Sequence, residues 1–224
     1  EGLLKGVANL SNNDVRFRTA EGLVVFVDPL AGPADPLVAR VGMAKPDLIL
    51  ITHSHRDHFN PAVIAEYIEA NPGVVLAGPA DVCGIAKEKG IDRMKAVATG
   101  NEYTMAGVRF LAVPAYFADK KSHPKENGWV GYALKINGAT YYVTGDSGPL
   151  PEMAELKADV IFPLLWGCGG NVDQAAEMAE LSKASLVVPV HHDGKIEVIK
   201  KFVSRLPKGT KILYSADGKP TVAP

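Results

Sequence analysis

The stretch that decides both the fold and the chemistry is residues 48–58, which read LILITHSHRDH. The first five residues form an apolar run, which predicts a strand buried on both faces. A polar cluster follows that strand directly. Residues two apart in an extended segment point to the same side, so His53 and His55 can bind the same metal ion. The chain then turns into a helix, which directs Asp57 and His58 to the other side, where a second ion can bind.

The helix that follows is marked at both ends. Asn60 is a favoured N-cap residue, and Pro61 stands at the first helical position. Residues 71–73 read NPG, which stops a helix. We therefore expect a helix over residues 61–70. The histidine cluster is held between a buried strand and a capped helix.

The rest of the chain alternates short apolar runs with helical stretches. Asn137-Gly138 is a strong hairpin signal. We expect strands at 23–27, 74–77, 103–113, 130–136, 140–144, 160–165, 186–190 and 211–214, and helices at 80–89, from 151, at 172–182 and at 195–206. Buried strands need cover on each face, so the pattern predicts an α/β protein with two sheets and helices outside both. We expect one domain over residues 1–224.

Composition narrows the class of protein. The 224 residues carry 24 Lys plus Arg against 25 Asp plus Glu, which disfavours nucleic acid as a partner. The longest apolar runs have strand length, so no membrane segment is expected. Two cysteines are too few for a disulfide framework. We expect a cytoplasmic protein, with export as the alternative because the chain starts at Glu1. The sequence leaves open whether the protein forms a homo-oligomer.

More ligands are available elsewhere in the chain. His123, Asp146 and His191 each lie just past a predicted strand or in a connecting loop, where α/β folds build their sites. Taken alone, each residue has a structural alternative. His123 can be a solvated loop residue, Asp146 a turn residue, and His191 a packing residue. The cluster at 53–58 needs partners, and this favours the ligand interpretation. We assign His191 to the metal and expect His192 to point elsewhere, because neighbours on an extended chain face opposite sides.

The order of these motifs resembles the metallo-β-lactamase superfamily. HxHxDH is followed by a histidine, by an aspartate in TGD, and by a histidine after a strand. Residues 113–115, 123–129 and 188–191 are similar to the compact branch with ascorbate-6-phosphate lactonase-like proteins and N-acyl phosphatidylethanolamine phospholipase D. Residues 9–18 depart from that branch, because they lack the histidine that its first strand often carries.

The resemblance implies a four-layer αββα sandwich with a dinuclear metal site. It implies a first ion held by three histidines, a second held by an aspartate and two histidines, and a bridging aspartate: His53, His55 and His123; Asp57, His58 and His191; and Asp146. Imidazole and carboxylate suit zinc, with manganese or iron as alternatives.

A paired-metal site supplies hydroxide near neutral pH, which attacks a carbonyl or phosphoryl centre. We therefore expect a metal-dependent hydrolase of a small ester, lactone or phosphodiester, with Asp57 and Asp146 as catalytic residues. An iron-dependent redox enzyme, a non-catalytic metal-binding protein and a true β-lactamase are the alternatives. Lys120, Lys121 and Lys125 can anchor an anionic substrate, although a solvated loop is the simpler interpretation. Cys168 is expected to be a buried, inert thiol.

Overall fold

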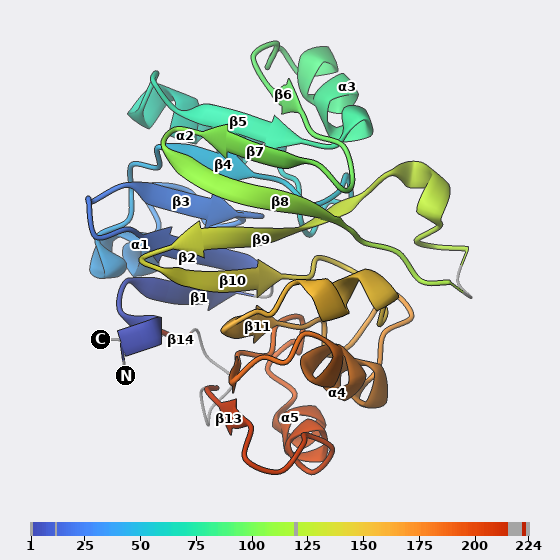
Figure 1. The fold of residues 1–224 in the computed structure, drawn as a ribbon. Helices are drawn as coiled ribbons and strands as arrows, with labels where there is room; N and C mark the ends of the chain where they lie inside the picture. The colour runs from blue at the N-terminus through green and yellow to red at the C-terminus, as the bar shows by residue number, and fades with distance from the viewer. Residues whose placement is uncertain (1, 12, 119–120, 215–220, 223–224) are drawn as a thin grey trace.

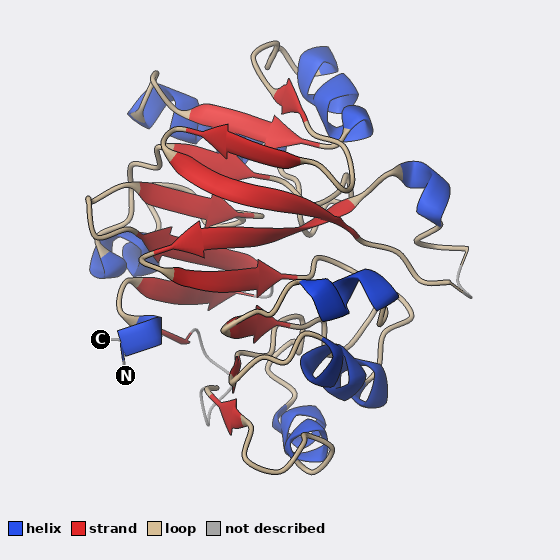
Figure 2. Ribbon diagram, in the orientation of Figure 1, coloured by secondary structure: helices blue, strands red, loops and turns tan. Residues whose placement is uncertain are grey.

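The computed structural model describes residues 2–11, 13–118, 121–214 and 221–222. Its strands form two seven-stranded sheets that lie face to face (Figures 1 and 2). The first sheet has the order β14-β1-β2-β3-β4-β5-β6, with bounds Thr221–Val222, Val7–Ser11, Asp14–Arg18, Val24–Val27, Leu48–Leu50, Val75–Gly78 and Lys95–Ala96. The second has the order β13-β12-β11-β10-β9-β8-β7, with bounds Lys211–Ile212, Leu186–Val187, Val160–Phe162, Ala139–Val143, Val130–Ile136, Val108–Pro114 and Glu102–Met105.

Helices cover the outer face of each sheet (Figure 2). The α-helices α1 to α5 span Pro36–Val41, Pro61–Ala70, Ala80–Glu88, Val172–Leu181 and Ile196–Val203. Short 3-10 helices η1 to η3 span Gly2–Leu4, Lys125–Asn127 and Pro151–Glu155. Helices α2 and α3 pack on the first sheet, and α4, α5 and η3 pack on the second. The α/β fold with an αββα layer order, expected from the sequence, is confirmed.

Three large apolar clusters hold the layers together, and a smaller one of Ala8, Leu10 and Val38 packs α1 against β1. The central one lies between the sheets and joins Phe17 and Leu50 of the first sheet to Phe110 and Phe162 of the second. The outer clusters lie beneath the helices on each side. Burying this apolar area provides most of the folding free energy, and the central cluster fixes how the two sheets face each other.

The parallel strands explain where polar residues collect. Strand β4 pairs in parallel with β3 and β5, and β11 pairs in parallel with β10 and β12. The carboxyl ends of parallel neighbours lie at the same edge of a sheet, and binding sites form there. Tyr132 of β9 joins the two sheets at this edge, because its hydroxyl donates to the carbonyl of Ile51 at 2.7 Å.

A buried ion pair fixes the loop that follows β3. The guanidinium of Arg16 donates to both carboxylate oxygens of Asp14 at 2.7 and 2.8 Å, and both side chains are fully buried. Asp14 also accepts from the backbone amides of Leu30 and Ala31, while Arg16 donates to the Ala31 carbonyl at 2.8 Å. Every charged atom of the pair has a partner, which a buried pair requires. The loop that carries Asp28 is therefore held in one conformation.

Several elements agree with the sequence-based expectations. Helix α2 spans the expected residues, and the side chain of Asn60 caps it by accepting from the amide of Ala62 at 3.1 Å. Strands β9 and β10 form the expected hairpin at Asn137-Gly138. No helix in the described part of the chain is long and apolar enough to cross a membrane.

Other expectations were wrong in detail. The strand expected over 103–113 is two strands, β7 and β8, because Ala106 and Gly107 adopt positive φ and turn the chain. The helix expected from Pro151 is only the 3-10 helix η3. The strands expected at 48–52, 160–165 and 186–190 end earlier, at Leu50, Phe162 and Val187. Beyond the last two strands, only an isolated bridge between Leu164 and Val190 continues the pairing.

Candidate metal centre

The loop after β4 is anchored by a buried carboxylate from the neighbouring strand. Asp28 follows β3 directly and is fully buried. It accepts from the backbone amide of Thr52 at 2.8 Å and from the Thr52 hydroxyl at 2.6 Å. The Nδ1 atom of His58 donates to the same carboxylate at 2.7 Å. Asp28 therefore orients one candidate ligand directly and holds the backbone from which the histidine cluster begins.

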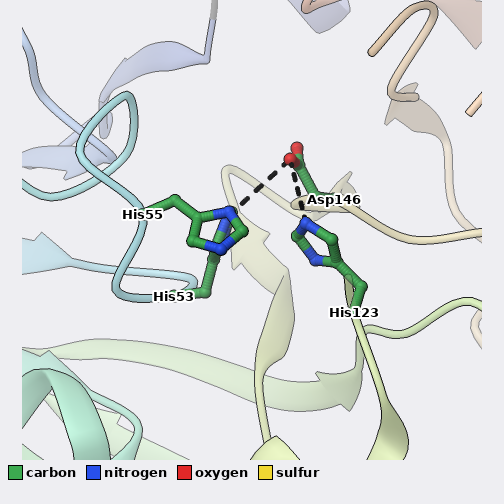
Figure 3. A group of neighbouring side chains, drawn as sticks. All are labelled: His53, His55, His123 and Asp146. Carbon is green, nitrogen blue, oxygen red and sulfur yellow. Dashed lines mark ion pairs between the residues drawn. The ribbon is translucent and has the colours of Figure 1, made fainter. Parts of the chain in front are cut away.

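The first set of side chains is the three-histidine group, which consists of His53, His55 and His123 (Figure 3). One nitrogen from each of these imidazoles and a carboxylate oxygen of Asp146 lie within 4.8 Å of one another. The ring of Trp129 packs against all three imidazoles at centroid distances of 4.9 to 5.0 Å. This indole closes the buried side of the group, so the imidazoles keep a fixed arrangement.

The second set is the mixed group, which consists of Asp57, His58 and His191. Their candidate ligand atoms also lie within 4.8 Å of one another. Nε2 of His191 lies 3.3 Å from Oδ2 of Asp57. Nε2 of His58 lies 2.8 Å from Nδ2 of Asn13, which comes from the turn between β1 and β2. The first hairpin has no histidine, and it places a buried amide beside this group instead.

Asp146 lies between the two groups. Its Oδ2 atom is 3.7 Å from Nε2 of both His53 and His123 and 3.9 Å from Nε2 of His191. Figure 3 marks the first two contacts with dashed lines. Its Oδ1 atom is 3.2 Å from Nε2 of His58. One carboxylate thus faces imidazoles from both groups, as a side chain shared by two cations must.

Glycine permits the close approach that brings Asp146 to this place. Gly145 has a φ of +59°, and a Cβ atom built there would lie 3.1 Å from the Cβ of Thr52. Any larger residue would combine backbone strain with a clash against the end of β4. The end of β10 in one sheet and the end of β4 in the other can therefore meet.

The polar atoms at the centre lack partners within the described protein. Nε2 of His53, both ring nitrogens of His123, Nδ1 of His191 and both carboxylate oxygens of Asp146 are buried and make no hydrogen bond. Buried polar groups are almost always paired, and an unpaired set of this size is costly. Imidazole nitrogens and carboxylate oxygens that converge in this way fit divalent cations such as zinc.

The two groups differ in their electrostatics. Burial lowers the pKa of His53 well below its ordinary value, and the neighbouring His58 lowers it further, although Asp146 opposes the shift. Burial likewise lowers the pKa of His123 to about 4, again against Asp146. Both imidazoles are therefore neutral at physiological pH, which is the form that binds a metal ion.

In the mixed group, neighbouring carboxylates outweigh burial and raise the pKa values of His58 and His191. Burial lowers the pKa of His58, but the Asp146 and Asp28 carboxylates outweigh it and raise that pKa to about 10. Burial also lowers the pKa of His191, and its contacts with Asp57 and Asp146 produce a net rise. The contact with His191 lowers the pKa of Asp57 to about 2, although burial opposes this. Without metal, His58 retains a proton that His53 and His123 do not.

The side chains of the neighbours His191 and His192 point to different surroundings, as expected, but for a different reason. His191 belongs to the mixed group, whereas Nδ1 of His192 accepts from the backbone amide of Gly194 at 3.2 Å. Strand alternation does not cause the separation, because β12 ends at Val187 and His191 has a φ of +55°. Asp28 and Cys168 share this left-handed conformation, with φ of +49° and +51°.

Cys168 lies at the centre, where an inert packing thiol was expected. Its sulfur, an oxygen of Asp146 and a nitrogen of His191 lie within 4.8 Å of one another. The side chain is half-buried, and burial raises the pKa of the thiol, as does the nearby Asp146 carboxylate. The sequence signal was its position after the strand that contains residues 160–162, beside a glycine-rich turn.

The loop that carries His123 brings lysines near the centre. An open cleft of about 460 Å³ is lined by two lysines, one glutamate and four uncharged residues: Lys121, Lys125, Glu126, Tyr116, Phe117, Ala118 and Pro124. The Lys125 ammonium lies 5.2 Å from the centre of the Tyr116 ring. Lys120, the third lysine named from the sequence, lies outside the described residues.

Sequence reasoning did not find Asp28 or Asn13 as parts of the centre. Asp28 was recognised only as the end of a strand, although a carboxylate after one parallel strand lies beside the residue that follows the next. Asn13 carries no local signal, because its contact with His58 joins residues 45 positions apart.

Comparison with known proteins shows the family of this chain. The family described as the beta-lactamase superfamily domain matches residues 24–192, which include every candidate ligand. The chain belongs to the metallo-β-lactamase superfamily. Within this superfamily it is similar to a UPF0173 metal-dependent hydrolase of Thermoplasma volcanium, with 31% identity over 182 residues that cover 79% of this chain and 78% of the relative.

Two further proteins are similar to this chain. A UPF0173 metal-dependent hydrolase of Thermococcus kodakarensis is 27% identical over 176 residues, which cover 75% of this chain and 77% of the relative. The solved structure of Igni18, a metallo hydrolase of Ignicoccus hospitalis, superposes with a TM-score of 0.73 at 20% identity over 96% of each chain. The metallo-β-lactamase fold and membership of a family of metal-dependent hydrolases are thus established for this chain.

Proposed function

We propose that the protein is a dinuclear metal hydrolase that cleaves a small anionic ester, lactone or phosphodiester within one catalytic domain, residues 1–224. The observation that carries this proposal is Asp146. Its carboxylate is buried, makes no hydrogen bond, and faces imidazoles of both ligand groups. A carboxylate between two cations offsets part of their mutual repulsion and fixes their separation.

Each ligand group would hold one ion. His53, His55 and His123 would hold the first, Asp57, His58 and His191 would hold the second, and Asp146 would serve both. This donor set of nitrogen and oxygen suits zinc, and manganese or iron are the alternatives to be decided by metal analysis. Seven side chains exceed what one tetrahedral ion can use, which supports two ions per chain.

Divalent ions bound here supply a nucleophile by lowering the pKa of water, and they polarise the oxygen of the scissile group. Asp57 is the solvent-exposed member of the mixed group, since its side chain is 41% exposed. His191 holds one of its carboxylate oxygens, and the other oxygen can orient the attacking water. Burial of five other candidate ligands keeps competing water away from them: His53, His58, His123, Asp146 and His191.

The loop that carries His123 supports an anionic substrate. Lys121 and Lys125 both line the open cleft, whose wall includes Pro124 next to His123. Two ammonium groups on one wall attract a carboxylate or phosphate and orient it toward the ions. The aromatic ring of Tyr116 beside Lys125 provides an apolar surface for the rest of a small substrate.

Metal analysis followed by a substrate screen tests the proposal. The protein is stripped with chelator, reloaded with zinc or manganese, and assayed on matched neutral and anionic esters, lactones and phosphodiesters. We expect two ions per chain and turnover that chelator abolishes. Replacing Lys121 and Lys125 by Ala should raise KM for the anionic substrate by about threefold to tenfold and leave the neutral one unchanged.

At most one ion per chain after reloading would contradict the dinuclear centre. Metal-loaded protein that turns over none of the three substrate classes would contradict the proposed reaction.

A further inference from the structure

The turn after β11 brings a thiol to the metal centre. Leu164 forms a bridge with Val190, which extends the parallel pairing of β11 and β12 toward the site. The chain then reverses in a tight turn, in which the amide of Gly170 donates to the carbonyl of Gly167 at 2.7 Å. Cys168 stands in this turn with a φ of +51°. The backbone is thus bent sharply at the residue that carries the sulfur.

The turn can approach the site only because it begins with glycine. A Cβ atom on Gly167 would lie 3.0 Å from Cε1 and 3.3 Å from Nδ1 of His191. The hydroxyl of Ser122, next to His123 in the sequence, donates to the Cys168 carbonyl at 3.3 Å. The turn is therefore packed between the loops that carry His123 and His191.

The thiol faces ligand atoms that have no partner of their own. Its sulfur lies within 4.8 Å of an oxygen of Asp146 and a nitrogen of His191. Asp146 is 1% exposed and His191 is 7% exposed. Both oxygens of Asp146 and Nδ1 of His191 lack a hydrogen bond. The sulfur thus converges with an unpaired carboxylate and with an imidazole whose Nδ1 is unpaired, so sulfur, oxygen and nitrogen donors meet at one place.

We infer that Cys168 is a further ligand of the centre, binding the ion of the mixed group as a thiolate beside Asp146 and His191. This inference rests on the proposed function and adds sulfur to its ligand set. On binding, the S–H bond breaks, a sulfur–metal bond forms, and one proton leaves to solvent. Thiolate is a soft ligand, so it favours zinc, cobalt or iron over manganese and magnesium.

Cobalt(II) distinguishes a thiolate ligand from a nearby thiol. Metal-free protein is titrated with cobalt, and absorption is recorded together with the number of ions bound per chain. We expect the intense near-ultraviolet band of a thiolate bound to cobalt in the wild type. Cys168→Ser should lose this band and keep the weaker visible bands of cobalt bound to nitrogen and oxygen.

The matched control is Cys83→Ser. Cys83 lies in α3, where its thiol donates to the carbonyl of Gly78 at 3.5 Å, and it belongs to no candidate ligand group in the described chain. This variant should keep the full thiolate band. Serine at 168 preserves the size of the side chain, so loss of the band there reports the sulfur itself.

Alkylation of the wild-type protein gives a test that needs no variant. Iodoacetamide labelling is followed by mass spectrometry at both cysteines, with and without zinc. Because bound metal removes the free thiolate that reacts, zinc should slow labelling of Cys168 by about tenfold or more and labelling of Cys83 by less than about twofold. Asp146→Asn should reduce the protection of Cys168.

A further expected result concerns metal preference. The ratio of zinc to manganese affinity should fall by about tenfold in Cys168→Ser and stay constant in Cys83→Ser.

The outcomes separate this inference from the proposed function. Two cobalt ions per chain without a thiolate band would overturn the role of Cys168 and leave the dinuclear centre standing. One ion with a band that Cys168→Ser removes would support the thiolate ligand and overturn the dinuclear centre. Absence of metal binding would overturn both.

Discussion

The three-histidine group and the mixed group are a few ångströms apart, yet they prepare for a metal ion in different ways. Burial keeps His53 and His123 neutral, and Trp129 fixes their rings without donating or accepting. His58 instead has its two nitrogens beside Asp28 and Asn13, and its pKa is raised to about 10. One group is ready for a cation, and the other must first release a proton.

The difference teaches that neighbouring imidazoles need not be equivalent ligands. An imidazole among other imidazoles loses its proton, because burial and neighbouring positive charge both disfavour the charged form. An imidazole between two carboxylates keeps its proton. The two ions should therefore bind with different affinities and different pH dependence, and Asp146 is the only candidate ligand in the described chain shared by both groups.

The largest effect is expected from Asp146→Asn, which removes the link between the groups. The substitution keeps the size and one oxygen but removes the charge that offsets repulsion between the ions. Ion binding in the mixed group should weaken, and hydrolysis should fall by about 100- to 1,000-fold. Metal stoichiometry, turnover and circular dichroism measure this. Activity and two-ion binding that both survive would show that Asp146 is only a turn residue.

The pair His191→Ala and His192→Ala separates a ligand from its neighbour. His191 contacts Asp57 and Asp146, whereas His192 caps the turn at Gly194. We expect the weaker ion to lose about 100-fold in affinity at 191 and less than about twofold at 192. The tighter ion, in the three-histidine group, should be unchanged in both. Competition with a chromogenic chelator measures both affinities, and a reversed order would refute the assignment.

Changing the pH should affect one group far more than the other. The pKa of His58 without metal is about 10, so below that pH a cation must displace its proton. One competing proton reduces the apparent affinity about tenfold for each unit by which the pH falls. The pKa of His123 is about 4, so that imidazole is already deprotonated across this range.

Calorimetric titrations at pH 6 and pH 8, in buffers of different ionisation enthalpy, measure both the affinities and the protons released. The weaker ion should lose at least about 100-fold in affinity between pH 8 and pH 6 and release at least one proton, that of His58. A second proton, released by a Cys168 thiol that binds the same ion, would increase the loss to about 10,000-fold. A weaker ion whose affinity is independent of pH would mean that His58 is not its ligand.

The smallest effect is expected from Asp28→Asn, because it changes a side chain that only orients a ligand. The amide keeps one acceptor for Thr52 but loses the charge that holds Nδ1 of His58. Removal of such a partner typically costs at least about tenfold in metal affinity. The affinity for the ion in the mixed group should fall by about tenfold, and that for the other ion should not change. Equal losses at both ions would indicate a general loss of structure.

The sequence predicted the part of the centre that is contiguous. His53, His55, Asp57 and His58 lie within six residues, so strand geometry and the following helix cap place them without knowledge of the rest of the fold. The capped helix α2 and the hairpin at Asn137-Gly138 were predictable for the same reason, because their signals are local.

The remaining parts depend on how distant strands pair. Three adjacent parallel strands of the second sheet, β10, β11 and β12, are followed by Asp146, Cys168 and His191, respectively. No single segment of the sequence indicates that these strands are adjacent. His123 and Asp146 were named because the first cluster needed partners. Asp28 and Asn13 were missed because their contacts with His58 join different strands.

The left-handed backbone at Asp28, Cys168 and His191 has a consequence for protein engineering. A non-glycine residue held at such φ costs of the order of 1 kcal/mol or more, and glycine in its place relieves that strain. A search for thermostable variants without metal in the assay would therefore reward glycine at positions 168 and 191. The chain would melt at a higher temperature while its centre was dismantled. Stabilisation of this enzyme should hold these positions constant and seek its gains in the apolar clusters beneath the helices.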